Sequence, residues 1–188
     1  MHYLDYGEYK QALELYGKSL DISEKIGDLD GMCNTLGEIG LIWKNVGDNE
    51  KALMYYKKSL EIALKINNNK SASTTLHNIG TIYFLSGRFD EAMENYQKSL
   101  AIKEKIGEIV GAADSYHQMG ILYNEMKEFP TALECSLRAY LLFSQIQSPK
   151  AFRAYQDILT ARSELSDTEF KEILKKYDIP PDAFDNPQ

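Results

Sequence analysis

GTIYFLSGRFDEAMENYQKS, residues 80–99, carries a pattern that returns every 40 residues along the chain. Residues 40–59 hold Gly, an aromatic residue, Ala, Tyr and Ser in the same columns, and the later columns recur in the first block. A fixed period of this kind is the sequence signature of a repeat architecture. The columns filled identically in three blocks are Gly7, Gly47, Gly87; Ala12, Ala52, Ala92; Tyr16, Tyr56, Tyr96; Lys18, Lys58, Lys98; Ser19, Ser59, Ser99; Leu20, Leu60, Leu100; Ile22, Ile62, Ile102; Lys25, Lys65, Lys105; and Ile26, Ile66, Ile106.

A fourth block follows the same register with weaker matches over residues 109–146. Ala132 stands in the alanine column, Leu137 lies near the leucine column, Arg138 replaces lysine and Ile146 continues an isoleucine column. We interpret this block as a degenerate repeat near the end of the array.

Each block predicts two amphipathic helices, because its apolar residues recur at spacings of three and four. Between the two helices a glycine such as Gly47 can adopt the left-handed conformation that ends a helix. The residues that follow this spacing are Leu36, Ile39, Trp43 and Val46 in the first helix of one block, and Ala52, Tyr56, Leu60 and Ala63 in the second.

Composition favours a folded, non-exported protein. The 188 residues are 44% hydrophobic and 26% charged, and the formal net charge of -7 disfavours a nucleic-acid partner. Cys33 and Cys135 lie far apart without metal-ligand spacing, which predicts free thiols in a reducing cytoplasm. No run of residues is apolar enough to predict a membrane span, so we expect no membrane partner.

The block pattern resembles the tetratricopeptide repeat family, which places small residues and aromatics at fixed positions of a helix pair. The resemblance implies an all-α, right-handed superhelical α-solenoid of antiparallel helix pairs. The 40-residue period, longer than the usual 34, is similar to repeats of kinesin light chain, of Leu-Gly-Asn polarity proteins and of bacterial or archaeal sensors. The residues that carry the resemblance are Gly40, Trp43, Ala52, Tyr56, Ser59; Gly80, Tyr83, Ala92, Tyr96, Ser99; and Gly120, Tyr123, Ala132, Ser136, Ala139, with the aromatic missing at Ser136.

The predicted organisation has three parts. A solenoid spans residues 1–147, with a partial first repeat over 1–28 and repeats near 29–66, 69–106 and 109–146. A capping helix pair covers 148–177, whose second helix begins with a Ser166 to Glu169 capping box, and a flexible tail covers 178–188. Tyr3 and Gly7 align with Trp43 and Gly47, so the first block begins late. We expect either a fragment of a longer solenoid, which we favour, or a homo-oligomer in which another copy covers this repeat.

The resemblance also implies a concave wall built from the first helix of each pair, which would bind a peptide. Its Asn, Gln and Thr side chains can bond a peptide backbone, while three apolar members offer contacts to side chains. The basic clamp that some members of the family use for a terminal carboxylate is missing, because the wall has little more than Lys44. The predicted wall comprises Asn34, Glu38, Leu41, Asn45, Thr74, His77, Asn78, Thr81, Phe84, Asp114, His117, Gln118, Ile121 and Asn124.

Metal binding and catalysis are both disfavoured. His77 and His117 occupy equivalent places, with Asp114 one turn before the second, but adjacent first helices lie roughly 10 Å apart. A zinc ion needs each nitrogen at about 2 Å. No converging nucleophile and base and no phosphate-binding glycine loop stand out, so we expect no enzyme, no metal and no cofactor.

Two functions remain open at this point. The first is a scaffold that binds a peptide or protein segment in the concave groove. The second is a ligand- or peptide-sensing regulatory domain of a larger signalling protein, because one fold serves many uses.

Overall fold

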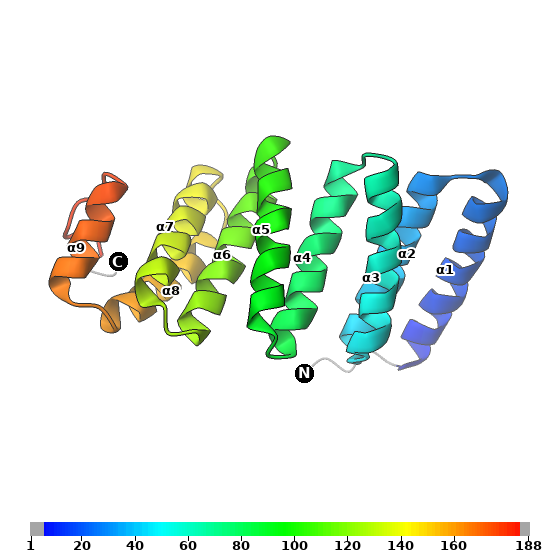
Figure 1. Cartoon of the computed structure of the whole chain (residues 1–188), viewed down its shortest axis with the longest axis horizontal. Helices are drawn as coiled ribbons and strands as arrows, with labels where there is room; N and C mark the ends of the chain where they lie inside the picture. Colours follow the sequence, from blue (N-terminus) through cyan, green and yellow to red (C-terminus); the bar gives the residue numbers. More distant parts are fainter. Residues whose placement is uncertain (1–5, 185–188) are drawn as a thin grey trace. The chain divides into compact units, whose positions relative to one another are not determined.

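The computed structural model describes residues 6–184, which contain nine α-helices and no strand (Figure 1). The all-α architecture predicted from the sequence is confirmed. The chain divides into two compact units, Met1–Ile106 and Gly107–Gln188. The first unit holds α1 (Tyr6–Ile26), α2 (Leu29–Val46), α3 (Asn49–Lys65), α4 (Asn69–Leu85) and α5 (Phe89–Lys105). The second holds α6 (Ile109–Glu125), α7 (Phe129–Gln145), α8 (Ala151–Ser163) and α9 (Asp167–Lys176).

The helix pairs α2/α3, α4/α5 and α6/α7 fall within the predicted blocks 29–66, 69–106 and 109–146. The turn inside the first complete pair has Gly47 at φ 89°, and the side chain of Asp48 then accepts a hydrogen bond from the backbone of Lys51 at 3.0 Å. A left-handed residue ends one helix and an acidic N-cap begins the next, as the sequence pattern predicts. Tyr3 and residues 185–188 lie outside the described part of the chain.

Close contact between a glycine and a tyrosine joins the two helices of each pair in the first unit. A Cβ atom added to Gly40 would lie 2.8 Å from the ring of Tyr56, and one added to Gly80 would lie 2.8 Å from the ring of Tyr96. Both tyrosines are fully buried. The absence of a side chain on each glycine therefore lets the ring pack directly against the helix backbone.

The hydroxyls of Tyr56 and Tyr96 differ in their hydrogen bonding, so replacing each tyrosine by phenylalanine should change stability in opposite directions. Tyr96 donates a hydrogen bond from its hydroxyl to Thr81 at 3.3 Å, whereas the buried hydroxyl of Tyr56 has no hydrogen-bond partner among the described residues. The residue equivalent to Thr81 is Leu41, which cannot accept a hydrogen bond. We expect Tyr96→Phe to lower the free energy of unfolding by about 1 kcal/mol and Tyr56→Phe to raise it by about 1 kcal/mol. Urea titrations followed by circular dichroism would measure both, and equal shifts for the two variants would contradict the prediction.

The second unit has its own core, which joins α7 to the C-terminal helices. Leu133 and Leu137 of α7 pack with Ile158 of α8 and with Phe170 and Leu174 of α9. Arg138 donates to the hydroxyls of Tyr177 at 3.1 Å and Tyr116 at 2.9 Å, which ties α7 to α6 and to the end of α9.

The C-terminal segment departs from the prediction in two places. The Ser166 and Glu169 capping box is present, but α8 begins at Ala151 rather than near residue 148. The predicted flexible tail is packed as far as Phe184, whose side chain is 4% exposed and whose carbonyl accepts a hydrogen bond from Arg162 at 3.1 Å. A single aromatic residue can hold a short segment in this way, because burying its ring contributes about 2 kcal/mol.

Within residues 6–184, none of the helices combines the length and the apolar character that a bilayer-crossing segment needs.

Candidate functional site

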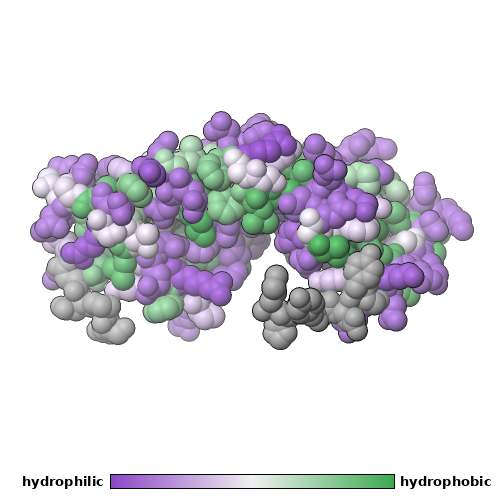
Figure 2. All heavy atoms as spheres, turned by 90° about the horizontal axis from the view of Figure 1, so that it is seen from below, coloured by the Kyte–Doolittle hydropathy of each residue, from purple (hydrophilic) through white to green (hydrophobic). Residues whose placement is uncertain are grey.

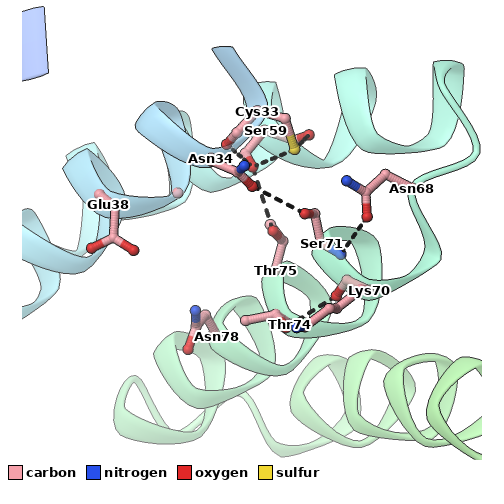
Figure 3. A pocket seen from close by; sticks show the side chains of 11 residues that line it. Cys33, Asn34, Glu38, Ser59, Asn68, Lys70, Ser71, Thr74, Thr75 and Asn78 are labelled. Carbon is pink, nitrogen blue, oxygen red and sulfur yellow. Dashed lines mark hydrogen bonds between the residues drawn. The ribbon is translucent and has the colours of Figure 1, made fainter. Parts of the chain in front are cut away.

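An open pocket of about 380 Å³ lies between α2 and α4, the first helices of two successive pairs in the first unit. Figure 3 shows Asn34 and Glu38 on one helix and Thr74 and Asn78 on the other, with Cys33, Ser59 and Thr75 between them. The complete lining is Cys33, Asn34, Gly37, Glu38, Ser59, Asn68, Lys70, Ser71, Thr74, Thr75 and Asn78.

The floor of the pocket is a small hydrogen-bonded cluster in which every residue is buried. Ser59 of α3 donates a hydrogen bond to the carbonyl oxygen of Cys33 on α2 at 2.8 Å, and its hydroxyl lies 3.4 Å from that of Thr75 on α4. The Cys33 thiol donates back to the Ser59 carbonyl at 3.4 Å. A cluster that spans three helices fixes their spacing, because each group would be left unsatisfied if one helix moved.

The rim of the pocket links α2 to the start of α4. Asn68 caps α4 by accepting a hydrogen bond from the backbone of Ser71 at 2.9 Å, and its amide donates to Asp30 at 2.8 Å. Ser71 in turn donates from its hydroxyl to the side-chain oxygen of Asn34 at 3.2 Å. Asn68, Lys70 and Ser71 are absent from the predicted wall, because the wall positions of this repeat were counted only from Thr74 onward. The Asn-x-x-Ser capping pattern was the signal that could have indicated this part of the rim.

Besides the Lys70 ammonium, three polar groups of the pocket remain available to a ligand. The amide of Asn78 and the carboxylate of Glu38 make no hydrogen bond to any described residue, and the amide nitrogen of Asn34 is unused. Lys70 is the one cation of the lining and Glu38 the one anion, so their formal charges cancel. Burial, with a smaller contribution from the nearby Glu38 carboxylate, raises the pKa of Tyr56, so its phenol stays neutral.

The other predicted wall residues of the first unit are largely engaged in packing. The His77 ring lies 5.3 Å from that of Tyr96, and Phe84 lies 6.0 Å from Phe89, measured between ring centroids. Thr81 donates to the His77 carbonyl at 3.1 Å as well as accepting from Tyr96.

Three residues of α2 complete the first-unit wall. Leu41 is half-buried and Asn45 exposed, and neither lines the pocket. Lys44 is half-buried, and burial lowers its pKa.

In the second unit the predicted wall residues of α6 meet side chains of the C-terminal segment. Asp114 accepts from Lys150 at 2.7 and 3.0 Å, and the Nδ1 atom of His117 lies 2.9 Å from a carboxylate oxygen of Asp157 on α8, without hydrogen-bond alignment. The His117 ring also meets the edge of Phe143. Helix α8 thus lies against α6. Asp157 of α8 and Lys150, the residue that precedes α8, are the partners of His117 and Asp114.

The last three wall residues, Gln118, Ile121 and Asn124, are half-buried on α6. Among the described residues no group of three or more His, Cys, Asp or Glu side chains is placed to hold a metal ion.

Comparisons with known proteins support the repeat fold. Residues 31–105 match the tetratricopeptide repeat family model. The crystal structure of BtubC from P. vanneervenii superposes with a TM-score of 0.80 at 16% identity, covering 92% of this chain and 72% of that one. A Podosopora anserina putative kinesin light chain with nearly identical TPR-like repeats gives 0.69 at 18% identity, covering 94% and 88%. MamA gives 0.59 at 20% identity, covering 90% of each chain. No curated protein matches the sequence.

Proposed function

We propose that this chain, whose residues 31–105 match the tetratricopeptide repeat family, binds a peptide or protein segment in the pocket between α2 and α4. The observation that supports this proposal is that unused polar groups from both helices point into one open pocket. Internal hydrogen bonds fix the floor of this pocket.

The chemistry of the unused groups suits an extended backbone. A peptide alternates N–H donors with C=O acceptors, and an asparagine amide can donate and accept at the same time. Asn34 and Asn78 stand on opposite helices, so a chain lying between them could bond to both. Glu38 would add an acceptor for an amide or for a basic side chain of the ligand.

The surface around the helices supports a polar mode of recognition. On the face drawn in Figure 2, hydrophilic side chains predominate and hydrophobic ones form small separate areas. Affinity from a few hydrogen bonds is modest, because each contributes about 0.5 to 1.5 kcal/mol. We therefore place the binding determinants at Asn34, Glu38 and Asn78. The hydroxyl of Thr74 already donates to the Lys70 carbonyl at 3.0 Å, so Thr74 and the remaining residues of the predicted wall stay predictions for a longer ligand.

A direct test uses a double variant of the pocket. Peptides selected from a random library on the intact chain should lose affinity by about tenfold or more when Asn34→Ala is combined with Asn78→Ala, because two hydrogen bonds disappear. Gln97→Ala on the exposed face of α5 is the matched control and should bind as the parent does. Fluorescence anisotropy would measure the dissociation constants. If the double variant bound every selected peptide as tightly as the control, the pocket would not be the binding site.

The proposal describes a non-catalytic scaffold without a cofactor. Its cytoplasmic location, predicted from the sequence, is supported by Cys33 and Cys135, which are both buried free thiols. A contact between copies of the chain, the other partner predicted from the sequence, would use α1 and leave the pocket free.

A further inference from the structure

Helix α1 repeats the columns of α3 and α5, but no helix among the described residues covers these columns. Ala52, Tyr56 and Ser59 of α3 are at most 1% exposed. Their equivalents in α1 are Ala12 and Tyr16, which are only half-buried, and Ser19, which is exposed. Figure 1 shows the reason: within the first unit α1 packs on α2, and no described helix lies on its other side.

This uncovered side presents an apolar stripe. Leu15, Ile22 and Ile26 are 66%, 59% and 71% exposed. On an ideal helix they lie within about 40° of one another, so they share one line along the helix surface. The equivalent residues of α3 are Tyr55, Ile62 and Ile66, all of which are half-buried in the covered pair.

Charges of alternating sign run along one flank of the stripe. They are Glu14, Lys18, Asp21 and Lys25, all of them exposed, and Glu14 lies 3.4 Å from Lys18. The point between Ser19 and Leu20 is midway along the helix between Glu14 and Lys25, and it is also midway between Lys18 and Asp21. A second α1 that packs antiparallel about this point would therefore place its Lys25 beside Glu14 and its Asp21 beside Lys18. Every flank charge would then lie near a charge of opposite sign.

The same charge pattern is interrupted on α3 and α5, the two helices equivalent to α1. Met54 stands in α3 where α1 has Glu14, and Ala101 stands in α5 where α1 has Asp21. The complete alternating set therefore occurs on α1 and not on α3 or α5.

We propose that α1 is a homodimer surface, on which a second copy of the chain docks its own α1 antiparallel about a two-fold axis between Ser19 and Leu20. The partner's Ile22 would then pack between Leu15 and Ser19, and Glu14 would pair with the partner's Lys25. A two-fold contact uses the same patch on both subunits, as this self-complementary charge order requires. The inference goes beyond the peptide pocket and does not depend on it.

Sedimentation equilibrium of the intact chain tests the apolar part. We expect a concentration-dependent dimer, and Ile22→Glu should weaken it by at least about 100-fold, because it places two charges in the apolar contact. Leu64→Glu on α3 is the matched control, since Leu64 is 57% exposed and lies off the proposed surface. Ile22 is itself exposed, so thermal unfolding should show the variant to be folded.

A charge exchange tests the antiparallel geometry. Glu14→Lys and Lys25→Glu alone should each weaken the dimer by about threefold to tenfold, and the double variant should return to within about twofold of the parent. If these charges acted only through ion pairs within their own helix, the double variant would not recover. It would still lack the Glu14 to Lys18 contact, and the charge at residue 25 would be reversed as well.

Three results would overturn the proposal: a parent chain that stays monomeric at about 1 mM, an Ile22→Glu variant that dimerises as the parent does, or a double charge variant without recovery. Recovery in the double variant together with loss in Ile22→Glu would support it.

Discussion

Gly80→Leu is expected to lower the free energy of unfolding by about 3 kcal/mol, through overpacking at the contact between α4 and α5. The first added carbon alone would lie 2.8 Å from two ring carbons of Tyr96 and 3.2 Å from the carbonyl oxygen of Ala92. Tyr96 is fully buried, so its ring has no free space to enter. The helices must separate, and the core between them loses its contacts.

The matched control is Gly17→Leu, which makes the same chemical change in the middle of α1. No atom lies within 4 Å of a Cβ added at Gly17. Leucine favours helix over glycine by somewhat less than 1 kcal/mol, so this variant should be as stable as the parent or slightly more stable. Chemical denaturation of both variants would measure their free energies of unfolding. A Gly80→Leu protein that unfolds at the parent's denaturant concentration would show that the small-residue column is not a packing requirement.

Phe170→Ala is expected to destabilise the second unit by about 3 to 5 kcal/mol, because it leaves a cavity among side chains that cannot collapse to fill it. Phe170 is 2% exposed and packs with residues of α7 and α8, and its ring meets the edge of Phe184. The loss should also release the segment that ends at Phe184, which would appear as faster amide hydrogen exchange there.

Phe152→Ala provides the comparison within the same C-terminal segment. Phe152 is 67% exposed on α8, so its removal should change stability by less than about 0.5 kcal/mol. Equal losses for the two phenylalanines would mean that the C-terminal helices are not packed on α7 as a cap.

The candidate site could be predicted only in part. Asn34, Glu38, Thr74 and Asn78 were reached by counting from the repeated glycine, and they line one pocket in the structure. Their role in binding stays a prediction. Asn68 and Ser71 were missed, because their position at the rim depends on hydrogen bonds from α4 to Asp30 and Asn34 on another helix.

The wall residues of α6 show more clearly that the sequence pattern does not specify contacts between distant segments. Asp114 and His117 occupy wall positions in the sequence pattern, yet they face Lys150 and Asp157 from the C-terminal segment. That segment lacks the glycine and alanine columns of a repeat, so nothing in its local pattern indicated that it would lie beside α6.

The amino-acid sequence alone determined the repeated helix pairs, their order and the turns within them, because these depend on spacings of three or four residues and on a period of 40. The tertiary structure alone decided which wall side chains stay open to a ligand, how far the C-terminal segment packs and which face of α1 is left uncovered. Those outcomes depend on side chains from different helices meeting across a stack, and a local period does not specify such contacts.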